Sequence, residues 1–146
     1  MQLIDYEYSG WNFLGFDVAN HFCEHAGFEF DLRRYPSRAQ QEHWLRAYLS
    51  ARSMRLPTRA SLAGGGAGAA TPAEEDDASE AFLDELYLRV NRFAPLSDAW
   101  WGLWAVIQAL HSPITFDFLP YAQRRMKAFA LHMEKFWGEA ARTRCN

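Results

Sequence analysis

The sequence is poor in the features that mark several specialised classes of protein. It has two cysteines, Cys23 and Cys145, in 146 residues. This is too few for a disulfide framework and indicates a reducing compartment. No apolar run reaches the roughly 20 residues that a membrane span needs, and the first residues lack the basic and apolar pattern of a signal peptide. We therefore expect a cytoplasmic chain without a membrane span.

The sequence also lacks an excess of positive charge. The formal net charge is −3, which gives no electrostatic footprint for nucleic acid, so a nucleic-acid partner is not expected. Apolar residues make up 49% of the chain and aromatic residues 16%, whereas a disordered chain would be poor in aromatics. The length and composition suit one folded domain or part of one.

Apolar residues recur every three or four positions over most of the chain, which is the period of an amphipathic helix. The pattern predicts helices over residues 13–25, 37–52 and 71–93, a central buried helix around 99–107, and a last helix after Asp117. In that last helix the residues that share one face are Ala122, Met126, Phe129, Ala130, Met133, Phe136 and Trp137.

Local signals mark the ends of these helices. Gly27 is suited to end the first helix, and Ser37 with Gln40 forms a capping-box pair at the start of the second. Pro95 predicts a break or a kink in the helical pattern, after which Ser97 can cap the continuing helix.

Two stretches do not follow the helical period. Residues 54–71 are rich in glycine and alanine but lack the preceding strand and the Lys-Ser/Thr of a phosphate-binding loop, so they predict a flexible surface loop. Leu3–Ile4 resembles the end of a buried strand. The fold class is therefore mainly α, with a strand remnant at the N-terminus.

Three acidic residues near the N-terminus are candidates for metal chemistry. Asp5 and Glu7 follow the strand end, and Asp17 lies twelve positions after Asp5. A carboxylate at a strand end can hold Mg²⁺ against nucleotide phosphates, because hard cations prefer oxygen ligands. The alternative is that these acids are solvated or cap turns, as acids next to turns commonly do.

Two tryptophans, Trp101 and Trp104, are three positions apart and share one face of the predicted buried helix, with Trp100 beside them. Such a pair can form an aromatic wall for a ligand cation, worth about 0.5–2 kcal/mol per well-placed ring. A nearby acid is needed to neutralise the cation, and Glu24 could serve. The alternative is ordinary core packing.

A third pattern is His21-Phe22-Cys23-Glu24-His25, which fits the H-x-x-E-H arrangement of some zinc peptidases. Histidines four apart on one helical face can bind Zn²⁺, with Glu24 as general base. A third ligand would have to come from a distant acid such as Glu80 or Glu85. A five-residue match of this kind often occurs by chance.

Taken in order, several short motifs resemble a known family. They are IDYEY (4–8), GFD (15–17), NHFCE (20–24), YPSR (35–38), WLRAYL (44–49), VNRFA (90–94), WGLW (101–104) and FDF (116–118). Together they resemble the C-terminal half of the choline/ethanolamine kinase family. The resemblance extends over nearly the whole chain apart from the loop at about 54–79.

The resemblance implies a protein-kinase-like (α+β) phosphotransferase fold, of which residues 1–146 would be the helical C-terminal lobe. ATP would be the phosphate donor. Asp5 would be the Mg²⁺ ligand that positions its phosphates, and Glu7 would lie close to that metal. Asp17 and Asn20 would support the structure around them.

The resemblance also assigns a substrate site. Glu24 would face the ammonium group of ethanolamine or choline, and Trp101 with Trp104 would form the aromatic pocket around it. It weakens the zinc interpretation, because His21 and Glu24 then belong to a kinase motif and only His25 is additional.

Two departures from the family pattern affect these expectations. The family's catalytic loop, an H-x-D-x-x-x-x-N run, precedes the IDYEY-like motif, whereas Met1 is here four residues before Asp5. That loop and the nucleotide-binding lobe are absent from the sequence, so we expect the chain alone to be a truncated and inactive form. Pro95 and Asp98 are unusual within the long helix.

The choice of substrate is less clear from the sequence. Ala26-Gly27 after Glu24 resembles ethanolamine kinases, and Cys23 before it resembles choline kinases. A quaternary ammonium favours a full aromatic cage, whereas a primary ammonium can donate hydrogen bonds to a carboxylate. We therefore expect an ethanolamine kinase acting in phosphatidylethanolamine synthesis. The alternatives are a choline kinase and a truncated module that binds ammonium ligands or pairs with another subunit, including a homodimer.

Overall fold

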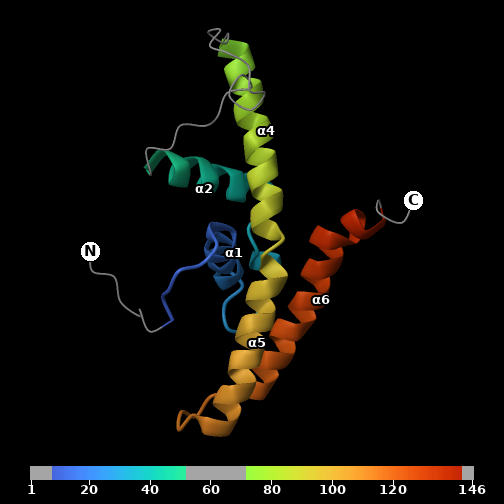
Figure 1. Ribbon diagram of the computed structural model, residues 1–146. Coiled ribbons are helices and arrows are strands. Elements are labelled where there is room, and N and C mark those ends of the chain that lie inside the picture. The colour runs from blue at the N-terminus through green and yellow to red at the C-terminus, as the bar shows by residue number, and fades with distance from the viewer. Residues whose placement is uncertain (1–7, 52–71, 143–146) are drawn as a thin grey trace.

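The computed structural model describes residues 8–51 and 72–142 (Figure 1). The predicted strand end at Leu3–Ile4 and the predicted loop at residues 54–71 lie outside the described residues. Within them the chain is helical, with no strand. Its elements are α1 (Leu14–Glu24), the 3₁₀ helix η1 (Leu32–Arg34), α2 (Arg38–Ala51), α4 (Pro72–Asn91), α5 (Ala94–His111) and α6 (Phe118–Arg142). The predicted mainly helical class is confirmed.

The helices α4 and α5 follow one another along a single long column, and α6 returns beside α5 (Figure 1). The helix α1 packs on the junction between α4 and α5, and α2 crosses α4. This arrangement brings α1, α5 and α6 together around one region of the molecule.

The ends of α1 and α2 follow the sequence signals. Gly27 adopts a left-handed backbone conformation with φ of 66°, which glycine reaches without the steric cost of a Cβ. The Gln40 side chain accepts a hydrogen bond from the Ser37 backbone N–H at 2.9 Å, and Ser37 Oγ accepts one from the Gln40 N–H at 3.4 Å. The predicted capping box is confirmed.

The break before Pro95 is also confirmed, but the prediction for Ser97 is wrong. Helix α4 ends at Asn91, and Pro95 lies in the first turn of α5, where its missing N–H costs no hydrogen bond. Phe93 occupies the N-cap position of α5. Ser97 is buried inside the helix and donates its hydroxyl to Asn20 of α1 instead.

The apolar core has two parts. The larger one lies between α1, α2 and α4, and its most enclosed side chains include Phe22, Leu45, Leu83 and Val90. A buried polar junction, in which Asn91 donates to Gln41 at 2.7 Å, fastens α2 to the end of α4. The smaller part of the core lies between α5 and α6 around Ala105, Phe118, Tyr121 and Ala122.

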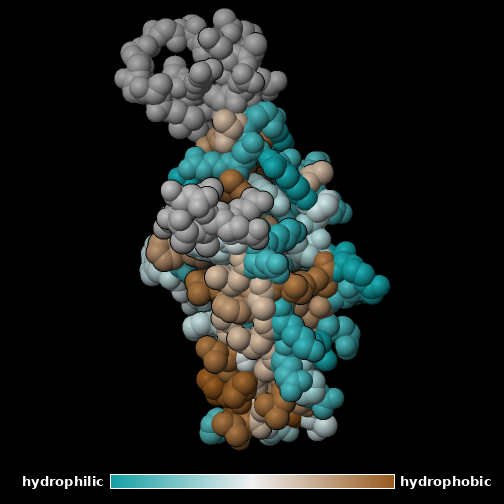
Figure 2. Space-filling view, turned by 90° about the vertical axis from the view of Figure 1, so that its right-hand side faces the viewer, coloured by the Kyte–Doolittle hydropathy of each residue, from teal (hydrophilic) through white to brown (hydrophobic). Residues whose placement is uncertain are grey.

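The helices α5 and α6 are less enclosed than their apolar patterns predict. In α5, Trp100, Leu103 and Ile107 are exposed, so α5 is not the fully buried helix that the sequence predicts. Figure 2 shows apolar side chains gathered at the end of the molecule where α5 meets α6. In the part of the chain that the structure describes, no helix has both the length and the apolar character needed to cross a membrane.

The predicted apolar face of α6 is likewise only partly covered. Met126, Met133 and Trp137 are exposed, whereas Arg125 and His132 are buried. Met133 and Trp137 border an apolar groove of about 670 Å³ between α1, α4, α5 and α6. Its lining includes Leu14, Leu86, Phe93, Phe129, Met133 and Trp137.

Candidate functional site

The predicted tryptophan pair forms an aromatic wall together with Tyr8. The ring centroids of Trp101 and Trp104 are 5.5 Å apart with an interplanar angle of 78°. Tyr8 meets Trp101 edge-on at 5.7 Å and Trp104 at 6.4 Å. These edge-to-face contacts are the arrangement that aromatic quadrupoles favour, and they leave both indoles half-buried rather than enclosed. We refer to Tyr8, Trp101 and Trp104 as the aromatic wall.

Hydrogen bonds fix the orientation of both indoles. Trp101 Nε1 donates to Asn20 Oδ1 at 2.7 Å, and the same oxygen accepts from Ser97 Oγ at 2.8 Å. Trp104 Nε1 donates to the Tyr8 hydroxyl at 2.8 Å. Because both indole N–H groups are satisfied within the protein, the rings can present their faces to a ligand without a polar atom to solvate.

Glu24 lies on α1 one turn beyond Asn20, on the same face of the helix. Its side chain is 58% exposed, and Oε1 accepts a hydrogen bond at 3.0 Å from Arg125 Nη2 on α6, whose side chain is only 2% exposed. Glu24 therefore combines an exposed carboxylate with one fixed oxygen. Asp17 is also exposed, in the first turn of α1.

Arg125 is held from several sides. Its Nε donates to the Tyr121 hydroxyl at 2.8 Å, and its guanidinium carbon lies 4.2 Å from the centre of the Phe30 ring. Burial lowers the pKa of Arg125, but the interactions with Tyr121 and Glu24 outweigh burial and leave that pKa above its usual value. Arg125 is therefore a fixed positive charge.

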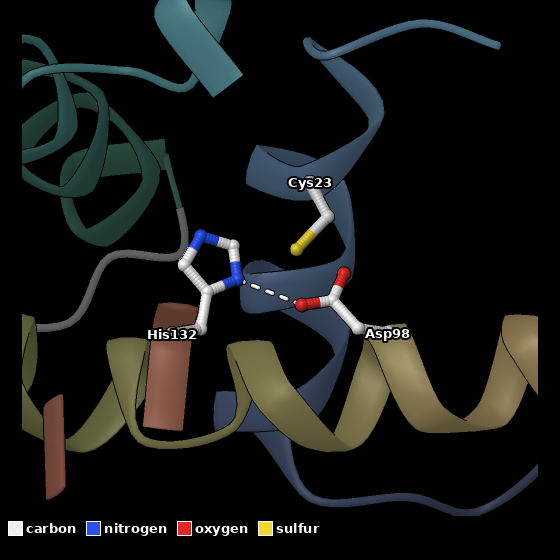
Figure 3. Close-up of side chains that lie close together, drawn as sticks. All are labelled: Cys23, Asp98 and His132. Carbon is white, nitrogen blue, oxygen red and sulfur yellow. Dashed lines mark hydrogen bonds and ion pairs between the residues drawn. The ribbon is translucent and has the colours of Figure 1, made fainter. Parts of the chain in front are cut away.

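A fully buried carboxylate, Asp98 of α5, faces Arg125 from the other side. Asp98 Oδ1 is 3.5 Å from Arg125 Nη1, and Asp98 Oδ2 is 2.7 Å from Nδ1 of His132 on α6 (Figure 3). Since a carboxylate only accepts hydrogen bonds, His132 Nδ1 is the donor. We call Glu24, Asp98, Arg125 and His132 the charged cluster.

Sequence reasoning missed most of the charged cluster. It noted Asp98 only as an oddity of the helix and did not single out Arg125 or His132. A usable signal is present, because Arg125 and His132 are seven positions apart and so share one helical face. Ionisable residues at two core-type positions of α6, together with an aspartate in the apolar α5, indicate that they pair with one another.

A sequence model of the choline/ethanolamine kinase family matches residues 1–130. The chain belongs to this family. Mouse ethanolamine kinase 1 is 42% identical over 130 residues, a match that covers 88% of this chain and 31% of the mouse protein. The probable ethanolamine kinase of Nematostella vectensis is 38% identical over 135 residues, covering 91% of this chain and 34% of that protein.

Mouse choline kinase alpha is also similar, with 36% identity over 138 residues, covering 88% of this chain and 27% of the mouse protein. The predicted family is confirmed, and the chain is closer to mouse ethanolamine kinase 1 than to mouse choline kinase alpha. The chain spans about a third or less of the length of these relatives.

Within the family motifs, the structure brings several predicted residues together and does not describe others. Asn20 and Trp101 are directly bonded, and Glu24 lies one turn from Asn20. The predicted Mg²⁺ ligand Asp5 and its neighbour Glu7 lie outside the described residues.

The residues of the zinc interpretation have other partners. Glu24 pairs with Arg125, and the two acids considered as a third ligand, Glu80 and Glu85, pair with arginines on α2 and α4. The structure therefore gives no support to a zinc peptidase site at His21, Glu24 and His25.

One other group of ligand types, Cys23, Asp98 and His132, converges in the described residues, with ligand atoms within 4.8 Å of one another (Figure 3). Nδ1 of His132 and Oδ2 of Asp98 are 2.7 Å apart, whereas two ligands of a tetrahedral Zn²⁺ would lie about 3.3 Å apart. Burial also raises the pKa of the Cys23 thiol. This geometry is that of a hydrogen-bonded core.

Proposed function

We propose that this chain is the helical C-terminal lobe of an ATP-dependent ethanolamine kinase with a protein-kinase-like fold. The hydroxyl oxygen of ethanolamine attacks the γ-phosphorus of ATP, ADP leaves, and the hydroxyl proton passes to a base. Membership of the family supports the reaction class. The observation that supports the substrate assignment is that Glu24 is exposed on α1 one turn from Asn20, whose side chain accepts a hydrogen bond from Trp101 of the aromatic wall.

The ammonium end of the substrate would bind between these two features. The faces of Trp101 and Trp104 attract a cation through their quadrupoles, and the Glu24 carboxylate accepts charge-assisted hydrogen bonds from a primary ammonium. A quaternary ammonium has no N–H to donate, so Glu24 favours ethanolamine over choline. Ala26, two positions after Glu24, is buried and adds no ring to the site.

The phosphate end of the reaction would depend on other residues of the family motif. In this proposal Asp5 binds the Mg²⁺ that positions the ATP phosphates, Glu7 lies close to that ion, and Asp17 supports the neighbouring loop. Carboxylate oxygens suit Mg²⁺. The product, phosphoethanolamine, enters phosphatidylethanolamine synthesis in the cytoplasm.

A fusion protein tests this function. The part of mouse ethanolamine kinase 1 that precedes its match to this chain is joined to residues 1–146, and phosphorylation of ethanolamine and choline is measured with Mg²⁺ and ATP. We expect ethanolamine to be the better substrate and Asp5→Ala to abolish the activity. A folded fusion that phosphorylates neither amine contradicts the proposal.

A second candidate function is an ammonium-binding module. It is favoured by one observation: the aromatic wall and the charged cluster are both formed within the described residues of this chain. The 146-residue chain without fusion would then bind ethanolamine in a calorimetric titration while transferring no phosphate. Binding without turnover separates this function from that of a complete kinase.

A further inference from the structure

Arg125 lies between two carboxylates with very different surroundings. Glu24 has a side chain that is 58% exposed, whereas the side chain of Asp98 is 0% exposed. If Arg125 had only Glu24 as a partner, the guanidinium would neutralise that carboxylate. An exposed ion pair of this kind has no net charge with which to attract a substrate cation.

Asp98 adds a second negative charge beside Arg125. Apart from His132, the charged cluster has one positive group, Arg125, and two negative groups, Asp98 and Glu24. These three groups together carry one net negative charge. Because Asp98 and Arg125 are buried, the only member with an open side is Glu24, and the excess charge is available there.

The geometry also prevents Asp98 from turning away from Arg125. One carboxylate oxygen faces the guanidinium, and the other is bonded to His132 at 2.7 Å. Figure 3 shows the imidazole and the carboxylate pointing toward one another from different helices. A buried carboxylate costs several kcal/mol unless it is paired in this way.

We propose that Asp98 is a positioning residue for the ammonium site. It offsets the positive charge of Arg125, so that Arg125 can orient Glu24 while Glu24 keeps a negative charge that attracts the substrate ammonium. Asp98 acts only through Arg125 and does not touch the ligand. This inference rests on the proposed function, because it takes Glu24 as the group that meets the ammonium.

The test is the affinity of the 146-residue chain for ethanolamine, measured by calorimetry near pH 8. Asp98→Asn leaves Arg125 and Glu24 as a neutral pair, and we expect the affinity to fall about tenfold or more. The double variant Asp98→Asn/Arg125→Met restores one net negative charge at Glu24, and we expect the affinity to return to within about threefold of the unmodified chain.

A control variant shows whether the effect depends on charge within the charged cluster. Asp84→Asn removes an exposed carboxylate on α4 that pairs with Arg38, away from the charged cluster. It is expected to bind within about twofold of the unmodified chain. Melting curves followed by circular dichroism establish that each variant is folded.

The outcomes separate the two proposals. Equal affinities of the unmodified chain and Asp98→Asn overturn the role of Asp98 and leave the ammonium site intact. A double variant that binds as weakly as the single one also overturns the role of Asp98, because a merely structural cluster gains nothing from a second substitution.

If Asp98→Asn does not fold, the double variant decides alone: affinity near that of the unmodified chain supports the inference, and a tenfold loss overturns it. Absence of binding in the unmodified chain overturns the proposed ammonium site, and this inference with it.

Discussion

Helix α6 buries polar side chains on one face and exposes apolar side chains on another, which is the opposite of what their hydropathy predicts. One face buries Arg125 and His132 against α1 and α5, and the other leaves Met126, Met133 and Trp137 exposed, the last two along the apolar groove. The buried polar groups are tolerated because each has a fixed partner. Burial in α6 therefore follows the positions of polar and charged partners on α1 and α5 as well as hydropathy.

The helices α5 and α6 are closely packed at Gly102. A Cβ there would lie 3.5 Å from Arg125 Cβ, an ordinary contact, and 3.2 Å from Met126 Sδ, a tight one. Nearby, the Arg125 guanidinium reaches both Asp98 on α5 and Glu24 on α1.

The largest loss of stability on the buried face of α6 is expected from Arg125→Met. Removing the guanidinium leaves Asp98 buried with His132 as its remaining partner, and loss of one member of a buried pair costs about 3–5 kcal/mol. Chemical denaturation measures the loss. The matched control is Lys127→Met, an exposed cation two positions along the same helix, which should change stability by less than about 0.5 kcal/mol. Equal effects of the two substitutions would contradict the comparison.

A smaller effect is expected from His132→Leu. The substitution removes the donor to Asp98 Oδ2 and leaves that oxygen buried without its bond, at a cost of about 1–3 kcal/mol. His132→Gln can donate to the same oxygen and should recover part of the loss. If the leucine variant is as stable as the unmodified chain in denaturation curves, the His132–Asp98 bond contributes nothing.

The exposed face should tolerate polar residues. Met133→Gln replaces an exposed apolar side chain, and we expect it to change the free energy of unfolding by about 0.5 kcal/mol or less. Denaturation of this variant, beside the His132 variants, gives both faces on one scale. A loss above 2 kcal/mol in the methionine variant would show that this face is packed.

The smallest effect at neutral pH concerns Tyr121 on the buried face. Burial raises the pKa of the Tyr121 phenol above its usual value, which is about 10 in an unfolded chain. The folded state therefore holds the proton more tightly, so the stabilisation is complete below about pH 10 and is lost as the pH rises further. Melting temperatures between pH 9 and 11 should fall more steeply for the unmodified chain than for Tyr121→Phe. Parallel curves would contradict this.

Much of the fold could be predicted from local patterns, since helix ends depend on neighbours in sequence. Gly27, the Ser37–Gln40 box and the break before Pro95 are examples. Ser97 could not be placed, because its hydroxyl serves Asn20, which lies 77 positions away in the sequence, and not its own helix end.

The candidate site likewise has residues that the sequence predicts and residues that only the structure brings together. Glu24, Trp101 and Trp104 stand in recognisable motifs, so their residue types and spacing are visible in the sequence. The role of Asp98 could not be predicted from the sequence, because its partners Arg125 and His132 lie 27 and 34 positions away and meet it only where α5 and α6 pack together. The hydrogen bond from Trp104 to Tyr8 spans 96 positions and has no local signal.

The central claim is that Glu24 and the aromatic wall bind an ammonium ion. Calorimetric titration of ethanolamine into the 146-residue chain tests it most directly, with Trp104→Leu beside Trp100→Leu, which removes an exposed indole from the same helix. We expect binding that weakens about 2- to 30-fold in Trp104→Leu, the equivalent of about 0.5–2 kcal/mol for one ring, and stays unchanged in Trp100→Leu. Equal affinities for the two tryptophan variants, or no heat from the unmodified chain, would contradict it.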